Sequence, residues 1–175
     1  IVCPRGRVSE LSEWSESDRP GVYILVGEDP DDTRPLAYIG EAENVLTRLR
    51  NHVTNKEFWD RVVFFTSKDE NLTKSHVKYL EARMVQLAKA ANRVSLKNAN
   101  EPTLATLPRS ARDAMEAFLE PARLLLGALG FNYLEPVRTP PLPVSSSEAA
   151  NANRPGPLAS VHFTFEVPKT GVKAM

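Results

Sequence analysis

The chain has 175 residues, of which 42% are hydrophobic and 25% charged, and its net charge is zero, so it is long enough to bury a core. It contains no run of eighteen apolar residues, and its opening IVCPRGRVSE lacks the charged and then apolar regions of a signal peptide, which excludes the usual signs of membrane insertion or secretion. The single cysteine, Cys3, has no partner for an internal disulfide or a thiolate zinc site, which favours a reducing compartment. Together these features lead us to expect a cytoplasmic protein that does not act at a membrane.

The charges are unevenly distributed along the chain. Residues 1–43 hold 4 Lys+Arg and 10 Asp+Glu, residues 44–100 hold 11 and 5, and residues 101–175 hold 7 of each. A basic middle region is typical of a surface that contacts phosphates, although solvated helices also produce such asymmetries by chance. The charge pattern alone therefore leaves a nucleic-acid partner open.

Two short apolar segments near the N-terminus predict a β-hairpin. The segment GVYILVG (residues 21–27) is rich in Val, Ile and Tyr, and PLAYIG (residues 35–40) follows after the polar turn signal GEDPDD. Gly40 is expected to let the backbone turn tightly into a helix over residues 43–53. The apolar positions that recur there at helical spacing are Val45, Leu46, Leu49 and Val53.

The next region predicts a strand between two helices. KEFWD (residues 56–60) is expected to form a short helical piece, and RVVFFTS (residues 61–67) a strand at the centre of the sheet or next to it. Thr73 is a plausible N-cap for a long helix over residues 74–91. Glu81 lies beside the apolar stripe of that helix, so we expect its carboxylate to be partly desolvated.

A further helix is predicted over residues 109–129. Pro121 lies inside it and removes a backbone donor, so this helix should kink or split in two. The order of strands and helices predicts an α/β (α+β) fold, with a small three-stranded or larger mixed or antiparallel sheet flanked by helices.

The composition changes toward the C-terminus. Residues 136–158 are rich in Pro, Ser, Ala and Asn and are interpreted as a linker after a domain of residues 1–135. SVHFTFEV (residues 160–167) alternates apolar and polar residues as a strand does. That strand should pair with the main sheet, with another chain or with another domain, and residues 159–175 are expected to begin a second domain.

Two tyrosines lie in the predicted hairpin strands, and charged and polar residues follow them in the predicted helices. The first strand contains GVY and the second YIG, an arginine follows the second tyrosine by ten residues, and a histidine follows one helical turn later. With a glutamate in the long helix and an asparagine after it, residues 20–100 resemble the GIY-YIG nuclease family, and residues 1–135 resemble a bacterial subgroup with an appended C-terminal domain of uncharacterised function. The site residues that the resemblance implies are Tyr23, Tyr38, Arg48, His52, Glu81 and Asn98.

The resemblance implies a metal-dependent endonuclease that hydrolyses DNA. Glu81 would hold one Mg²⁺ or Mn²⁺, because Mg²⁺ accepts one or two carboxylates together with waters and substrate phosphate. Arg48 would offer its planar donor fork to the phosphate, and one of the two tyrosines would deprotonate or orient the attacking water. The residues expected to contact nucleic acid are Arg48, Arg50, Lys74 and Lys78.

One position departs from the family pattern. Many relatives carry a lysine directly after YIG, where this sequence has Glu41. If Glu41 faces the site, its charge should raise the pKa of the tyrosine, which makes His52 an alternative general base or the proton acceptor of the tyrosine.

Simpler interpretations of the same residues stay open. Strand tyrosines are often packing residues, and Glu81 can pair with Lys78 or Lys74 on its own helix. Asn98 can be a turn residue, and Asn100 competes for its role. The alternatives to an active nuclease are a catalytically idle GIY-YIG scaffold that binds nucleic acid or protein, and an interaction module in which the tripeptides are coincidental.

Overall fold

The computed structural model divides the chain into two units, Ile1–Arg138 and Thr139–Met175, which are described separately. The residues that it describes are 1–69, 71–136, 165–166 and 173–174. Within them, no helix is both long enough and apolar enough to cross a membrane.

The described part of the second unit is one pair of short strands. β6 (Phe165–Glu166) pairs antiparallel with β7 (Lys173–Ala174). The two described residues of the predicted C-terminal strand therefore pair within the second unit, and this partner was not among those predicted. The predicted linker, apart from Pro136, lies outside the described residues.

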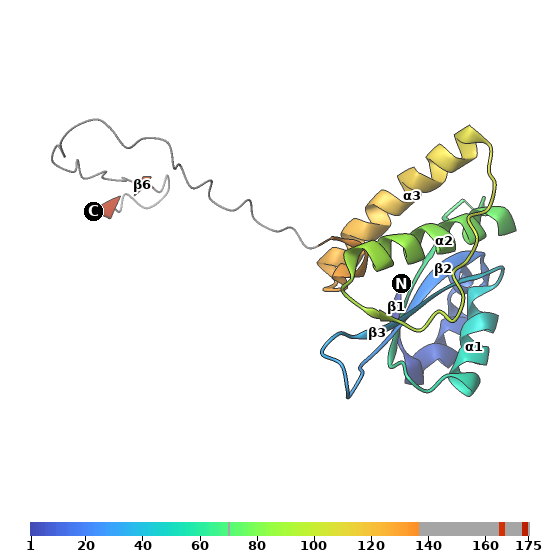
Figure 1. Ribbon diagram of the computed structural model, residues 1–175, viewed down its shortest axis with the longest axis horizontal. Coiled ribbons are helices and arrows are strands. Elements are labelled where there is room, and N and C mark those ends of the chain that lie inside the picture. Colours follow the sequence, from blue (N-terminus) through green and yellow to red (C-terminus); the bar gives the residue numbers. More distant parts are fainter. Residues whose placement is uncertain (70, 137–164, 167–172, 175) are drawn as a thin grey trace, which may run out of the picture. The chain divides into compact units, whose positions relative to one another are not determined.

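The first unit contains a mixed sheet of five strands (Figure 1). In spatial order these are β1 (Val2–Pro4), β4 (Arg61–Thr66), β2 (Gly21–Gly27), β3 (Leu36–Ala42) and β5 (Ser95–Leu96). The pairings β1–β4, β4–β2 and β2–β3 are antiparallel, and β3–β5 is parallel. The predicted α+β class is thus confirmed, and β4 lies next to the central strand β2 as expected.

Helices cover both faces of this sheet (Figure 1). Because side chains of a strand alternate between faces, Val22 and Ile24 of β2 belong to one core, and Tyr23 and Leu25 to the other. The first core is covered by α2 (Lys74–Ala91), α3 (Arg109–Ala128) and η3 (Asn132–Leu134). The second is covered by α1 (Val45–Asn55) and η1 (Arg5–Glu13), and η2 (Ser15–Asp18) contacts α1.

Side-chain caps fix where the first two long helices begin. The Asn44 side chain accepts a hydrogen bond from the Thr47 amide at 2.8 Å and caps α1. Thr73 forms a capping box with His76 at the start of α2, which confirms Thr73 as the N-cap. Each cap gives a hydrogen-bond partner to an amide of the first turn that has none within the helix, so the cap fixes the residue at which the helix begins.

The segment from residue 56 to residue 60 is not helical, contrary to the prediction. Trp59 is buried in the second core, and the Asp60 amide donates to the Val26 carbonyl at 2.9 Å. These contacts pull the backbone into the sheet before β4 begins, so it cannot form a helical turn.

The split predicted at Pro121 does not occur, and α3 continues from Arg109 to Ala128. Pro121 is exposed, whereas Leu119 and Ala122 on either side of it are buried against the first core. Packing of both halves thus offsets the loss of one backbone hydrogen bond.

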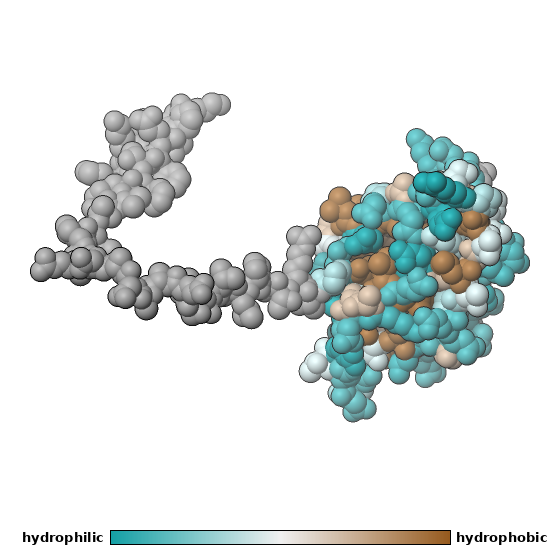
Figure 2. Space-filling view, turned by 45° about the horizontal axis from the view of Figure 1, so that its top comes forward, coloured by the Kyte–Doolittle hydropathy of each residue, from teal (hydrophilic) through white to brown (hydrophobic). Residues whose placement is uncertain are grey.

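The surface carries several separate apolar areas among hydrophilic residues on the face seen in Figure 2. Among the described residues, three exposed leucines lie close together in sequence near the end of α3, namely Leu124, Leu125 and Leu129.

Candidate active site

The candidate site begins where the Tyr23 side chain lies across β3. Tyr23 pairs with Gly40 in the β2–β3 register. A Cβ atom at position 40 would overlap the Oη and Cζ atoms of Tyr23. Gly40 is therefore inside the strand and not in a turn, contrary to the prediction. The glycine is needed because it leaves room for the phenol ring.

His52 approaches the same tyrosine from α1. Its side chain is buried, with 7% exposure, and its Nε2 atom lies 2.7 Å from the Tyr23 hydroxyl. The Trp59 indole donates to the His52 carbonyl at 3.4 Å. The helix therefore presents His52 to the sheet and not to solvent.

Tyr38 completes an aromatic group with these two residues. Its ring centroid lies 6.3 Å from that of Tyr23 and 5.5 Å from that of His52. Unlike Tyr23, which is fully buried, Tyr38 is partly exposed. The Lys56 ammonium lies 4.3 Å from the centroid of the Tyr38 ring. Tyr38 is thus the tyrosine of this pair that a ligand can reach from solvent.

The protonation states of Tyr23 and His52 follow from their burial. Burial first of all, together with the charges of Lys56 and Arg48, lowers the pKa of His52 from 6.5 to about 4. Burial also raises the pKa of Tyr23 well above its ordinary value of 10.0. At neutral pH the imidazole is neutral and the phenol is protonated, so Nε2 is able to accept the hydroxyl hydrogen.

Glu81 lies half-buried on α2 and has an unusually weak acid group. Burial first of all, together with repulsion by Glu41, raises its pKa from 4.5 to about 7, against the opposing effect of Arg48 and Lys78. Within the described residues, the Glu81 carboxylate makes no hydrogen bond or ion pair. Its carboxylate is therefore available to a ligand, and the predicted partial desolvation is observed.

The negative charge of Glu41 acts on the titratable groups of the candidate site. It raises the pKa of Tyr23, Tyr38 and Glu81, each of which is raised first of all by burial. This is the effect expected from a carboxylate in place of the family's lysine. The pKa of Tyr38 is also raised by Glu81 and lowered by Arg48, so both charged residues lie within electrostatic reach of this tyrosine.

Asn98 is bound to the main chain of β3. Its side-chain oxygen accepts from the Ile39 amide at 3.1 Å, and its side-chain nitrogen donates to the Ile39 carbonyl at 2.7 Å. The Asn98 amide thereby extends the pairing of β5 along β3. The structure thus places Asn98 where it holds the strand that carries Tyr38.

The four residues predicted to contact nucleic acid are all exposed. Lys74 forms an ion pair with Glu43 at 2.9 Å. The side chains of Arg48, Arg50 and Lys78 form no hydrogen bond or ion pair with the described residues. Two of the four residues, Arg48 and Lys74, line a hollow of about 280 Å³, whose other charged lining residues are the carboxylates Glu41 and Glu43. Three of the four cations therefore remain available to an anionic ligand.

The donor set for a divalent cation is small. Among the described residues, no three His, Cys, Asp or Glu side chains are grouped so that they could hold a metal ion. Glu81 nevertheless fits the needs of Mg²⁺, which keeps several waters and takes one or two carboxylates. A cation would also relieve the repulsion between Glu81 and Glu41.

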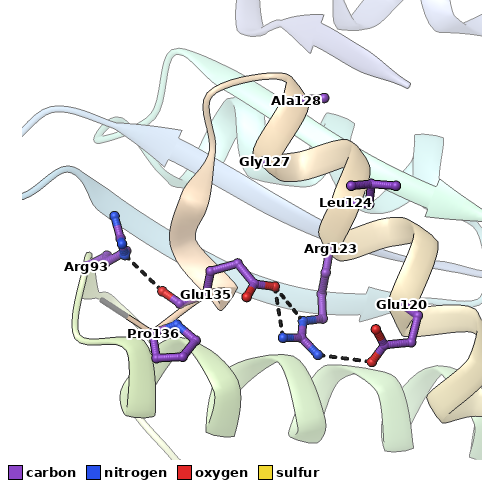
Figure 3. A pocket seen from close by; sticks show the side chains of 8 residues that line it. All are labelled: Arg93, Glu120, Arg123, Leu124, Gly127, Ala128, Glu135 and Pro136. Atoms are coloured by element: carbon purple, nitrogen blue, oxygen red, sulfur yellow. Dashed lines mark hydrogen bonds and ion pairs between the residues drawn. The ribbon is translucent and has the colours of Figure 1, made fainter. Parts of the chain in front are cut away.

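A larger hollow of about 710 Å³ lies beside α3, away from the tyrosines (Figure 3). Arg123 is held there by Glu135 and Glu120 at 2.9 and 3.1 Å. Arg93 donates to the Glu135 carbonyl at 2.9 Å. Because these arginines already have partners within the unit, this hollow is a weaker candidate for an anion site.

Lys56 is the residue of this site that the sequence analysis missed. It is the C-cap of α1, and Arg48, His52 and Lys56 are spaced by four residues each, which places them along one line of the helix. That spacing is the signal by which it could have been found.

No family model, no curated protein and no solved structure matches the chain. The resemblance to the GIY-YIG family is therefore neither supported nor contradicted by comparison. The function has to be inferred from the geometry of the residues themselves.

Proposed function

We propose that this protein is a metal-dependent endonuclease that hydrolyses DNA phosphodiester bonds at a GIY-YIG-type site. The observation that carries the proposal is the hydrogen bond between Tyr23 and His52 beside Tyr38, within electrostatic reach of Arg48 and Glu81. Packing alone does not require a buried histidine, two tyrosines, an unpaired arginine and a desolvated carboxylate at one place.

Each residue has a role that its environment permits. Arg48 is exposed and donates to the phosphate oxygens. Tyr38 is partly exposed and orients the attacking water, because its raised pKa keeps the hydroxyl protonated at neutral pH. A pKa near 4 makes His52 a weak base, so His52 orients Tyr23 by accepting its hydrogen bond.

Glu81 is the residue that would hold the cation. When bound there, a divalent cation would neutralise phosphate charge, stabilise the leaving oxygen and lower the pKa of bound water. The Glu81 carboxylate must be ionised for this role. Because its pKa is about 7 in the free protein, cation binding competes with a proton, so the affinity for the cation should rise with pH.

A catalytically idle scaffold that binds nucleic acid or protein is the second candidate. The repulsion between Glu41 and Glu81 favours it, because two carboxylates near one phosphate oppose the binding of an anion. In that case about half of the Glu81 side chains would be protonated at neutral pH, and most of them below it.

Incubation of the protein with supercoiled plasmid separates these candidates. The nuclease predicts nicked or linear plasmid with Mg²⁺ or Mn²⁺, no product with EDTA, and no product from Glu81→Ala. Glu57→Ala is a matched control, because Glu57 is an exposed carboxylate outside the site. Intact plasmid under all conditions, with retained DNA binding, would instead support the idle scaffold.

A further inference from the structure

One cation of the aromatic group has no role in the function proposed above. Lys56 follows the last residue of α1, and its amide donates to the His52 carbonyl at 3.0 Å. Its backbone is extended, with φ −135° and ψ 122°. Its ammonium lies 4.3 Å from the centroid of the Tyr38 ring.

We propose that Lys56 is a positioning residue, whose ammonium holds the Tyr38 ring and whose charge adds to burial in favouring the neutral form of His52 that accepts the Tyr23 hydroxyl hydrogen. As a role in catalysis this rests on the nuclease function proposed above. The contact with Tyr38 and the effect on His52 do not depend on that function.

The contact with Tyr38 has the geometry of a cation–π interaction. Such contacts occur within about 6 Å of a ring centroid and strengthen as the cation is desolvated. Lys56 is partly buried, and among the described residues it makes no ion pair with a carboxylate. The face of Tyr38 is therefore the partner that the structure offers to this ammonium.

The effect on His52 follows from the groups around the imidazole. Tyr23 faces it from β2, Tyr38 from β3, and the cations Arg48 and Lys56 act on it from α1. After burial, Lys56 makes the larger of the two charge contributions that lower the pKa of His52. A charged imidazole would be repelled by both cations, and its Nε2 could no longer accept a hydrogen bond.

Nuclear magnetic resonance of the imidazole tests the charge effect. The charged fraction of His52 at pH 5 should rise about two- to threefold in Lys56→Met, because loss of a nearby charge moves the midpoint of the titration by roughly half a pH unit. Lys56→Arg should restore the original fraction. Lys89→Met is the matched control, because Lys89 lies on α2 and pairs with Glu101. An unchanged fraction in Lys56→Met would overturn the proposal.

A measurement on the unmodified protein tests the contact without any variant. The methylene protons next to Nζ of Lys56 should be shifted upfield by the ring current of Tyr38, away from the signals of the other lysines. If all lysine signals coincide, Lys56 does not lie on the ring and the proposal is wrong.

The plasmid assay then tests the catalytic part. At saturating Mg²⁺ and neutral pH, the cleavage rate should fall in Lys56→Met, because the Tyr38 ring is no longer held, and Lys56→Arg should restore it. If the parent protein does not cleave while the fraction of charged His52 still rises in Lys56→Met, the nuclease function fails but the positioning by Lys56 stands. If Lys56→Met cleaves at the rate of the parent protein, the positioning role in catalysis is wrong.

Discussion

The Tyr23 hydroxyl and the His52 Nε2 atom lie 2.7 Å apart in the buried space between β2 and α1. Neither side chain can lose this partner without leaving a polar atom away from water, which costs about 1–3 kcal/mol. The pair therefore fixes the rotation of α1 against the sheet, and with it the place of Arg48 at the edge of the site.

The burial of His52 should make the protein less stable in mild acid. The folded pKa of about 4 lies below the ordinary 6.5, so the unfolded chain binds the proton first, and the stabilisation present above pH 6.5 is lost as the pH falls toward 4. We expect His52→Gln to reduce the loss of unfolding free energy between pH 7 and pH 5 by about 1–2 kcal/mol. Urea titrations at both pH values measure this, and an equal loss in both proteins would show that His52 is not buried as described.

Glu81 should act on stability with the opposite sign. Its folded pKa of about 7 lies above the ordinary 4.5, so the folded state is penalised as the pH rises through this range. Without added cation, Glu81→Gln should stabilise the protein more at pH 8 than at pH 5, by about 1–2 kcal/mol after allowance for partial exposure. Glu57→Gln should show no such trend. A gain that does not depend on pH would place Glu81 in solvent.

The close approach of Tyr23 to Gly40 should make position 40 intolerant of any side chain. Gly40→Ala places a methyl group on the phenol ring, and we expect a loss of about 1–3 kcal/mol in unfolding free energy together with a weaker Tyr23–His52 contact. Gly6→Ala is the control, because no atom lies within 4 Å of the added Cβ there. Equal stability of the two variants in urea would contradict the described packing.

Local periodicity and capping made three features predictable from the sequence, namely the hairpin, the capped helix α2 and the burial of Glu81. The edge strands β1 and β5 were not predictable, since each has only two or three residues and is defined by its partner strand. The backbone of residues 56–60 was also not predictable, because the tertiary contacts of Trp59 and Asp60 override a weak helical tendency.

The sequence predicted which residues belong to the candidate site better than it predicted how they are arranged. The motif predicted that Tyr23, Tyr38 and His52 lie together, and in the structure their ring centroids lie within 6.3 Å of one another. The sequence could not show that Gly40 makes space for a ring, because that depends on the register between two strands. It also could not show that Lys56 lies on Tyr38, since the contact joins a helix end to a different strand.

If DNA is the ligand, its affinity should depend steeply on salt. Counterion release gives a slope of about −0.9 in log affinity against log salt for each phosphate contacted. Arg48→Gln and Lys78→Gln should each reduce this slope by about one contact, whereas Arg109→Gln, on α3 and near Asp113, should not. Filter binding at several salt concentrations measures the slopes. Affinity that is flat with salt, or absent even at low ionic strength, would favour an interaction module.

The most direct test of the proposed function compares cleavage with binding in Glu81→Gln. This change keeps the size of the side chain and removes the charge that would hold the cation, so we expect Mg²⁺-dependent nicking of plasmid to disappear while DNA affinity changes little. Glu57→Gln should cleave like the parent protein. If Glu81→Gln retains Mg²⁺-dependent cleavage, Glu81 does not belong to the catalytic site, and the proposal of a GIY-YIG-type nuclease is contradicted.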